Sequence, residues 1–351
     1  MDHMDHKERF FATIARAPVD RPAVWMGIPD PAAHAGLCRY FSVADMRQLA
    51  VRLDDDVWPV ELPYHSPTAD AIYAAFDFAK QGKIDREHRT LNAPGFFEGF
   101  TDPERVEEFA WPNPTDYIDR EACRAVVREA PGGAAVLGVI WSAHFQDACA
   151  AFGMENAFVT LYEAPEMFRA VIDRIVDFYL RANEVFYEAT RGQLDAVLIG
   201  NDFGAQHGLL LSPAMIRKYA LPGTRALVAQ AKEYGIRVIH HSCGAVRDII
   251  PDLISAGVDV IHPIQALATG MEPRGLRDDF GDRVAFCGGV DAQSLLVRGT
   301  PGQVREAVRE LASIFPTGLI VSPSHEAILP DTPPANVEAM FSAVREVADA
   351  D

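Results

Sequence analysis

The residues with the clearest chemical potential lie in the segment His240-His241-Ser242-Cys243-Gly244, which follows the apolar residues Val238 and Ile239. This pattern predicts a short buried strand that ends on a His-x-Cys-Gly step. Side chains at positions i and i+2 of a strand point to the same face, so His241 and Cys243 can direct an imidazole and a thiolate at one point. Nitrogen and sulfur ligands suit Zn²⁺, which keeps an open coordination position when it is catalytic. Two ligands do not complete a site, so another part of the chain must supply a third.

Two later residues could be that third ligand. His325 follows the last apolar run of the chain, and in a closed barrel the eighth strand lies across the mouth from the fifth, where His241 stands. Cys287 is the alternative, because its strand lies closer to the fifth. Free cysteine is among the most frequently buried residue types, so we favour His325 as the ligand and Cys287 as a small core residue. His240 alternates with His241 and should therefore point away from the site.

Polar residues at other strand ends could complete the chemistry. Asp202 ends the apolar run Val197-Leu198-Ile199-Gly200, where its carboxylate could be an acid–base group, a substrate anchor or the N-cap of a turn. Asp202 and His241 are our candidate catalytic residues. The candidates for substrate binding are Asn201, Gln265, Asp291, His144, Trp141 and His207. Structural hydrogen bonds to neighbouring loops would explain Gln265 and Asp291 equally well.

These positions converge only if the chain forms a barrel. Short apolar runs alternate with helical patterns, which is typical of βα units and a parallel sheet. The runs predict eight strands, over Pro22–Met26, Asp56–Val60, Ala134–Ile140, Asp195–Asp202, Arg237–Ser242, Val258–Pro263, Arg283–Gly289 and Gly318–Ser324. Eight strands are what a (β/α)₈ TIM barrel requires, and residues at the carboxyl ends of its strands line the active site.

The rest of the organisation follows from this barrel. Ser212-Pro213, Thr300-Pro301 and Thr332-Pro333 have the residue types that begin helices. The segment 64–114 fits no βα unit, and we interpret it as an insertion near the N-terminal third, a hairpin with a helix that lies over one barrel mouth. We find no linker and no internal repeat, so residues 1–351 are expected to form a single domain.

Bulk composition limits the possible functions. The chain has 351 residues with 50 acidic and 32 basic side chains, and its net charge of −18 disfavours nucleic acid and anionic membranes as partners. No apolar run reaches the ~18 residues of a membrane span, and the N-terminus lacks the apolar core of a signal peptide. The five cysteines are odd in number and widely spaced, unlike a disulfide framework. We expect a cytoplasmic protein with reduced thiols.

The dispersed motifs together resemble a known family. The C-terminal half is similar to the uroporphyrinogen decarboxylase superfamily, and more closely to its branch of cobalamin-dependent methyltransferases. The segments that carry the resemblance are Asn201-Asp202-Phe203-Gly204, Leu211-Ser212-Pro213, His241-x-Cys243-Gly244, Gly257-Val258-Asp259, Pro263-x-Gln265, Phe280-Gly281-Asp282-Arg283, Cys287-Gly288-Gly289-Val290-Asp291-x-Gln293, Gly299-Thr300-Pro301, Pro323-Ser324-His325, Thr332-Pro333 and Asn336. Weaker matches extend the resemblance over nearly the whole chain.

Two departures from the family pattern bear on function. The decarboxylases carry an arginine-rich segment after the first strand, whereas this chain reads Trp25-Met26-Gly27-Ile28-Pro29-Asp30 there, without arginine. The zinc methyltransferases of the branch use His-x-Cys and a later cysteine, and this chain places His325 at the position that resembles it. A histidine in place of the cysteine keeps zinc feasible but removes one negative charge.

The resemblance implies a zinc-dependent methyltransferase that moves a methyl group between a small methylated substrate or acceptor and a corrinoid protein. Zinc held by His241, Cys243 and His325 would activate an acceptor thiol or polarise an ether oxygen. The cobalamin would be carried by the partner, because the chain has no Asp-x-His-x-x-Gly motif. A homodimer is possible. The alternatives are a metal-free decarboxylase or lyase acting on a small carboxylated substrate, and a non-catalytic binding subunit.

Overall fold

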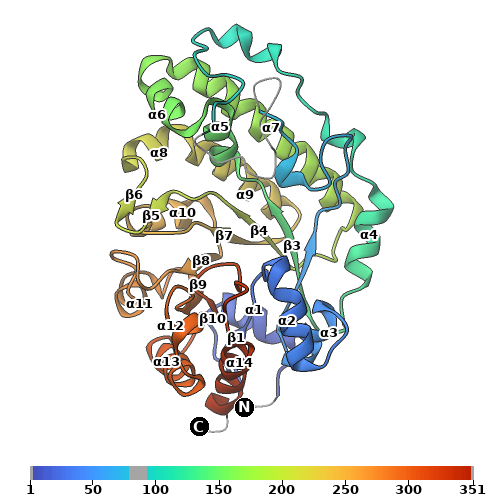
Figure 1. The fold of residues 1–351 in the computed structure, drawn as a ribbon, viewed down its shortest axis with the longest axis vertical. Helices are drawn as coiled ribbons and strands as arrows, with labels where there is room; N and C mark the ends of the chain where they lie inside the picture. Colours follow the sequence, from blue (N-terminus) through green and yellow to red (C-terminus); the bar gives the residue numbers. More distant parts are fainter. Residues whose placement is uncertain (1–2, 79–92, 349–351) are drawn as a thin grey trace.

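A computed structural model describes residues 3–78 and 93–348, and it confirms the predicted barrel (Figure 1). Eight parallel strands form a nearly closed sheet in the order β1-β10-β9-β8-β7-β4-β3-β2. They are β1 Ala23–Val24, β2 Val57–Glu61, β3 Ala135–Trp141, β4 Ala196–Gly200, β7 Arg237–His241, β8 Val260–Ile264, β9 Ala285–Val290 and β10 Leu319–Pro323. Each lies within or beside one of the eight predicted runs. A two-stranded hairpin, β5 Gly204–Ala205 with β6 Gly208–Leu209, follows β4.

Helices surround the barrel in the order expected of βα units. They are α1 His6–Ile14, α2 Pro31–Phe41, α3 Met46–Leu53, α4 Arg120–Arg128, α5 His144–Phe152, α6 Met154–Glu163, α7 Pro165–Ala189, α8 Pro213–Tyr219, α9 Leu221–Glu233, α10 Ile250–Ala256, α11 Pro273–Phe280, α12 Leu295–Arg298, α13 Pro301–Ile314 and α14 Pro334–Ala348. The predicted starts of α8 and α13 are confirmed, since Ser212 and Thr300 cap them through their side-chain oxygens. The last helix begins at Pro334, one residue beyond the predicted Thr332-Pro333 start.

Apolar side chains form two layers. The inner layer fills the barrel and includes Leu137, Leu198 and Ile239, and Phe10 and Ile14 of α1 pack into it. The outer layer lies between the sheet and the helices. Because strand residues alternate between the layers, the residues just past the inner layer point into the barrel mouth.

The barrel closes between β1 and β2 through side chains. The only backbone hydrogen bond between them in the described residues runs from the Asp56 N–H to the Val24 carbonyl, at 3.1 Å. Carboxylates take the place of the missing ladder: Val24 N–H donates to Asp56 Oδ2 at 2.8 Å, and Met26 N–H donates to Asp55 Oδ2 at 2.9 Å. We call this junction the seam. It leaves room for a cavity between the first two strands.

The described parts of the segment 64–114 contain no α-helix, and residues 79–92, on which the predicted hairpin and helix partly fall, lie outside the described residues. Its described parts, 64–78 and 93–114, hold the 3-10 turns η1 Ile72–Ala74, η3 Pro103–Glu108 and the start of η4 Pro114–Asp116. Aromatic side chains pack it against α7: the ring of Phe76 lies 4.7 Å from that of Phe178. Burial of these aromatic rings stabilises the packing of the segment against α7, because each ring buries a large apolar surface and needs no strand pairing.

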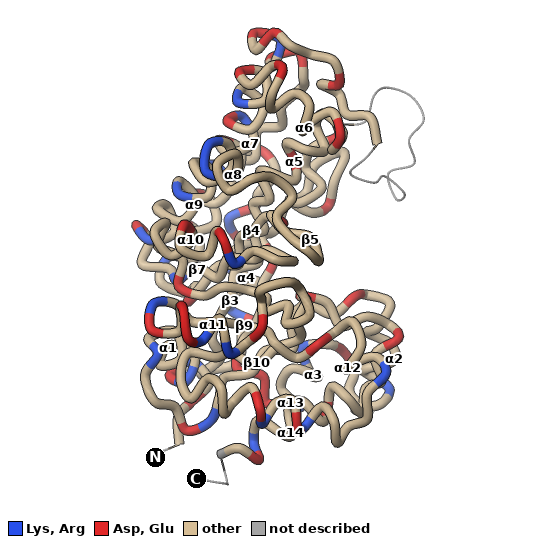
Figure 2. Tube along the Cα trace, turned by 90° about the vertical axis from the view of Figure 1, so that its left-hand side faces the viewer, with Lys and Arg blue, Asp and Glu red and all other residues tan. Residues whose placement is uncertain are grey.

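The outer surface is strongly charged. Acidic and basic residues lie mostly along the outer helices and loops (Figure 2), and acidic ones outnumber basic ones in the sequence by 50 to 32. None of the described helices is both long and apolar enough to cross a membrane.

Candidate metal centre

Five potential ligands converge at the carboxyl ends of three strands. Asp202, His241 and Cys243 form one group, and Cys243, His325 and Glu326 form a second group that shares the thiol. Within each group the ligand atoms all lie within 4.8 Å of one another. The residues follow β4, end or follow β7, and follow β10, which are far apart in sequence and meet at the barrel mouth. We call these five residues the ligand cluster.

His241 and Cys243 come together as their i, i+2 spacing predicts. The Sγ atom of Cys243 lies 3.3 Å from Nε2 of His241, and the other ring nitrogen of His241, Nδ1, lies 3.0 Å from Nδ1 of His262. His241 is 5% exposed and His262 is fully buried. The His241 imidazole is therefore held from both sides, with Nε2 toward the cluster and Nδ1 toward the barrel interior.

Asp202 contacts both other members of the first group, His241 and Cys243. Its Oδ1 accepts a 2.9 Å hydrogen bond from the Cys243 backbone N–H and lies 3.2 Å from His241 Nε2, while Oδ2 accepts from Gln146 at 3.1 Å. Burial acts to raise the pKa of Asp202, but the hydrogen bond and charge of His241 outweigh it and lower this pKa to about 2. The same contacts raise the pKa of His241 well above its usual value against the effect of burial.

Glu326 is placed to hold a cation. Its Oε2 atom is buried and has no hydrogen-bond partner in the described structure, although His325 Nδ1 lies at 3.1 Å and His241 Nε2 at 3.7 Å. A buried carboxylate oxygen without a partner is unfavourable unless a charge compensates it. Two imidazoles, a thiol and two carboxylates also match the ligand types of zinc. The residues present therefore fit the metal that the sequence implied.

Sequence reasoning missed three residues around this cluster. Glu326 could have been noticed, because it directly follows His325 at the end of β10. His262 ends an apolar strand, which is a weaker indication. Gln146 lies on α5, a helix rather than a strand end, and no sequence pattern separates it from an ordinary surface glutamine.

Trp141 covers one side of the cluster. Its ring meets the ring of His241 edge-to-face with 5.4 Å between centroids. Trp141 and Ser142 both have left-handed backbones, with φ of 50° and 54°, where β3 shifts register against β4. Two consecutive non-glycine residues in this region store strain, and such strain clusters at functional sites. The left-handed backbone at Trp141 places the indole against the ring of His241.

Several sequence-predicted residues are used within the protein and do not reach the cluster. Asn201 accepts from Phe145 N–H at 2.7 Å and contacts His144, whose own Nε2 bonds the Ala220 carbonyl at 2.9 Å. Asn201 and His144 are both buried. They fasten α5 to the end of β4, and their role in substrate binding stays a prediction.

Gln265, Asp291 and His207 also lie outside the ligand cluster, and their role in substrate binding stays a prediction. Gln265 Oε1 accepts from the Gly244 N–H at 2.8 Å and so holds the turn after Cys243. The Asp291 carboxylate accepts three backbone N–H groups of the turn that follows β9. His207 lies exposed in the turn between β5 and β6.

Cys287 lies away from the ligand cluster. It is fully buried among the inner apolar side chains of the barrel, and burial raises the pKa of its thiol. Among the described residues the metal-capable groups include His325 and leave Cys287 out. The geometry therefore places His325 beside Cys243, in a group that does not include His241, and His325 as the third ligand of His241 and Cys243 stays a prediction.

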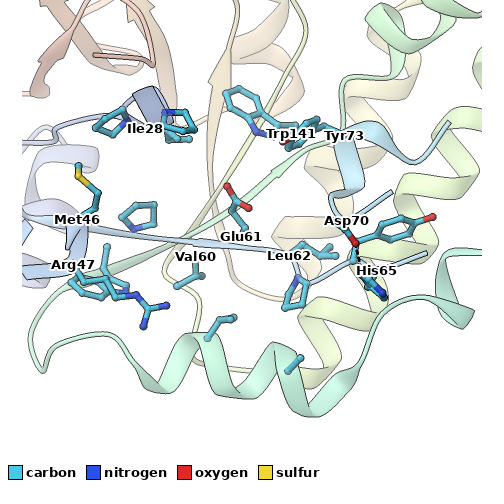
Figure 3. A pocket seen from close by; sticks show the side chains of 18 of the residues that line it. Ile28, Met46, Arg47, Val60, Glu61, Leu62, His65, Asp70, Tyr73 and Trp141 are labelled. Atoms are coloured by element: carbon cyan, nitrogen blue, oxygen red, sulfur yellow. Dashed lines mark ion pairs between the residues drawn. The ribbon is translucent and has the colours of Figure 1, made fainter. Parts of the chain in front are cut away.

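A cavity of about 1110 Å³ is lined by Trp141 (Figure 3), whose ring also contacts His241 of the cluster. It runs from Glu61 and Trp141 at the barrel mouth, past Asp55 at the seam, to Met46 and Arg47 of α3. None of the five cluster residues lines it, and Trp141 is the side chain that faces both. The cavity and the cluster are thus neighbouring sites on one barrel mouth.

Comparison with known proteins identifies the family. The family model for uroporphyrinogen decarboxylase (URO-D) matches residues 5–347. The chain belongs to the uroporphyrinogen decarboxylase family. A curated family relative, a uroporphyrinogen decarboxylase of Syntrophotalea carbinolica, is 29% identical over 242 residues, which span 65% of this chain and 64% of the relative.

The fold of this uroporphyrinogen decarboxylase family member also matches a solved structure. A methyltransferase from Methanosarcina mazei superposes with a TM-score of 0.73, covering 98% of this chain and 99% of that one, at 17% sequence identity. At that identity the likeness establishes a shared barrel along the full length of both chains.

Proposed function

We propose that the protein is a zinc-dependent methyltransferase that moves a methyl group between a small methylated substrate or acceptor and a corrinoid protein. The observation that supports this most directly is the convergence of five ligand atoms at the barrel mouth, one of them a buried carboxylate oxygen without a hydrogen-bond partner. The full-length likeness of the fold to a methyltransferase is consistent with it.

His241, Cys243 and His325 are the proposed zinc ligands, with Asp202 or Glu326 able to add a carboxylate. A zinc ion bound there would supply Lewis acidity to a thiol or an ether oxygen. The chain's own contribution is positioning: His262 orients His241, and Asp202 holds the backbone of Cys243. Such partners behind the ligands commonly fix ring orientation and basicity.

Methyl transfer is a displacement, so alignment and exclusion of water dominate its catalysis. Trp141 is suited to both tasks because its indole covers His241 and closes one wall of the neighbouring cavity. Asp202 remains the candidate acid–base group or substrate anchor. The methyl carrier in this proposal is a separate corrinoid protein that docks on the barrel mouth.

A decarboxylase is the second candidate, because the curated relative bears that name. Porphyrinogen carboxylates would need cationic side chains, and the segment Trp25–Asp30 after the first strand has none. Arg47, the single arginine or lysine among the cavity-lining residues described, is already paired with Glu129. These features favour the methyltransferase over action on uroporphyrinogen.

The proposal is tested by metal analysis of purified wild-type protein, Cys243→Ser and His325→Ala. Wild type should hold about one zinc per chain, and each substitution should weaken zinc binding about tenfold or more, because a ligand is lost. Cys38→Ser is the matched control, since that partly buried thiol lies on α2 and contacts Met46.

The same variants are assayed for methyl transfer from methylcobalamin to a thiol, followed by the visible spectrum of the cobalamin. Activity should fall with zinc content and persist in Cys38→Ser. Zinc-free protein that transfers methyl groups at the wild-type rate would overturn the mechanism. Release of CO₂ from a small carboxylic acid, without zinc, would support the decarboxylase.

A further inference from the structure

The cavity beside the cluster has a negative lining. Its acidic residues are Asp55, Glu61, Asp70, Asp116 and Asp119. Its one described arginine, Arg47, forms an ion pair with Glu129 on the neighbouring element. The whole chain carries a charge of −18, so the field in the cavity attracts cations and repels anions.

Most of these carboxylates already have a structural partner. Asp55 accepts N–H groups at the seam, and Asp119 caps α4 through the backbone N–H of Glu121 at 2.7 Å. Asp70 pairs with His65 at 2.5 Å. These three carboxylates are therefore already engaged in hydrogen bonds or an ion pair, and burial also raises the pKa of Asp55 well above its usual value, so Asp55 adds little negative charge.

Glu61 is different, because its side chain has no ion pair or hydrogen bond in the described structure. Asp116 is the other lining carboxylate without an ion pair or hydrogen bond in the described structure, and it lies exposed in the turn η4. Glu61 lies four residues after Val57 on β2 and therefore shares its face; Val57 belongs to the inner layer, so Glu61 points into the barrel mouth. It is nevertheless exposed, since the cavity opens in front of it.

Two aromatic side chains line the cavity together with this carboxylate. Glu61 is level with Val139 on β3, and Trp141 follows two residues later on the same face. Tyr73 from η1 lines the same corner, and Glu61, Tyr73 and Trp141 also line a narrow adjoining recess. Figure 3 shows the Glu61 carboxylate rising from β2 toward the space beside Trp141. We call these three residues the acidic aromatic corner.

We propose that the acidic aromatic corner binds the positively charged group of an organic cation, such as a quaternary ammonium, with the rest of the ligand along the cavity. A free carboxylate supplies the counter-charge, and aromatic faces attract a poorly hydrated cation. An anion is excluded by the same field. A bare metal ion is not held, because a single carboxylate without further ligands does not make a metal site.

The proposal of this ligand site is based on the residues that line the cavity, and it does not require a metal at the cluster. Trp141 connects the two, since its ring contacts His241 and also lines the corner. An organic cation in the corner is therefore placed beside the proposed reaction centre, where it would be a substrate for the proposed methyltransferase. That extension rests on the proposed function.

The test uses choline and its neutral carbon isostere, 3,3-dimethylbutan-1-ol. Binding is followed by calorimetry and by tryptophan fluorescence, because Trp58 and Trp141 line the cavity. Wild type should bind choline about tenfold more tightly than the isostere. Glu61→Gln should remove this preference. Asp70→Asn, a second lining carboxylate that is already paired, should keep the preference within about twofold.

Equal binding of the two probes by wild type, no binding of choline, or an unchanged preference in Glu61→Gln would each overturn the proposal. The metal-site variant Cys243→Ser separates the two hypotheses. If it loses zinc and still prefers choline, the cation site stands independently of the metal. Zinc binding together with absent choline binding would leave the metal proposal intact and reject this one.

Discussion

At the level of single residues, the candidate centre depends on which nitrogen of His241 faces the ligand cluster. Nε2 faces Cys243 and Asp202, and Nδ1 faces Nδ1 of His262. Burial lowers the pKa of His262 well below its usual value, so His262 is neutral and can accept a hydrogen from His241. With Nδ1 bonded to His262, Nε2 is the nitrogen of His241 that a metal would bind in exchange for its proton.

Replacing His262 tests this positioning role. His262→Phe removes the acceptor for His241 Nδ1 and should weaken zinc binding by about 10–100-fold, measured by competition with a chelator. His240→Phe is the control, because His240 is buried next to His241, has no hydrogen-bond partner in the described structure, and stacks on Phe203. Full zinc affinity in His262→Phe, or an equal loss in His240→Phe, would contradict the role of His262.

At the level of elements, the barrel depends on the seam between β1 and β2. Asp56 is fully buried there and accepts hydrogen bonds from Arg9 at 2.6 Å, Arg21 at 2.7 Å and the Val24 N–H at 2.8 Å. Arg9 comes from α1 beneath the barrel. One carboxylate therefore joins α1, the loop before β1, and both strands of the seam.

Asp56→Asn should destabilise the fold. The substitution removes the buried charge that Arg9 and Arg21 share and leaves them only Asp20 and Asp54 as ionic partners. Weakening a buried ion-pair network in this way costs up to about 3–5 kcal/mol. Urea unfolding measures the loss. Arg128→Ala, which removes an exposed pair with Glu121, should leave the unfolding midpoint unchanged. A midpoint for Asp56→Asn equal to wild type would show that the seam does not rely on this carboxylate.

A second inter-element contact predicts a pH dependence. Asp147 on α5 accepts a 2.5 Å hydrogen bond from the Tyr179 hydroxyl on α7, and burial raises the pKa of Asp147 to about 7 against the effect of that bond. Its ordinary value is 3.8, so the folded state holds the proton more tightly. The contribution to stability is complete below about pH 4 and is lost as the pH rises to about 7.

Asp147→Asn removes this titration and keeps an acceptor for Tyr179. The variant should therefore lose less thermal stability than wild type between pH 5 and pH 8, as measured by Tm in a series of buffers. Parallel Tm profiles for the two proteins would mean that Asp147 does not control the slope.

At the level of the whole molecule, two neighbouring sites share one barrel mouth. The ligand cluster gathers residues that follow β4, β7 and β10, while the acidic aromatic corner belongs to β2, β3 and the turn η1. The seam separates β1 from β2 and opens the cavity on which the corner depends. A net charge of −18 favours cationic small molecules at this mouth.

Much of this architecture was predictable because it depends on local patterns. All eight strands follow from short apolar runs, and the starts of α8 and α13 follow from Ser-Pro and Thr-Pro. The segment 64–114 was less predictable, since its aromatic rings gain their energy from α7, whose position is not encoded nearby. Asn201 and His144 follow strand ends but are used to fasten α5 to β4.

The sequence by itself determined that His241 and Cys243 point to one place, because alternation along a strand is a local property of the backbone. Only the tertiary structure decided which other side chains lie next to His241 and Cys243. The positions of Glu326, His262 and Asp202 depend on how the strands curve around the barrel, which sums interactions far apart in sequence. Tertiary structure also determines the left-handed backbone at Trp141 and the carboxylate seam. The cavity, and the Glu61 side chain that has no partner in it, can therefore be recognised only in the folded molecule.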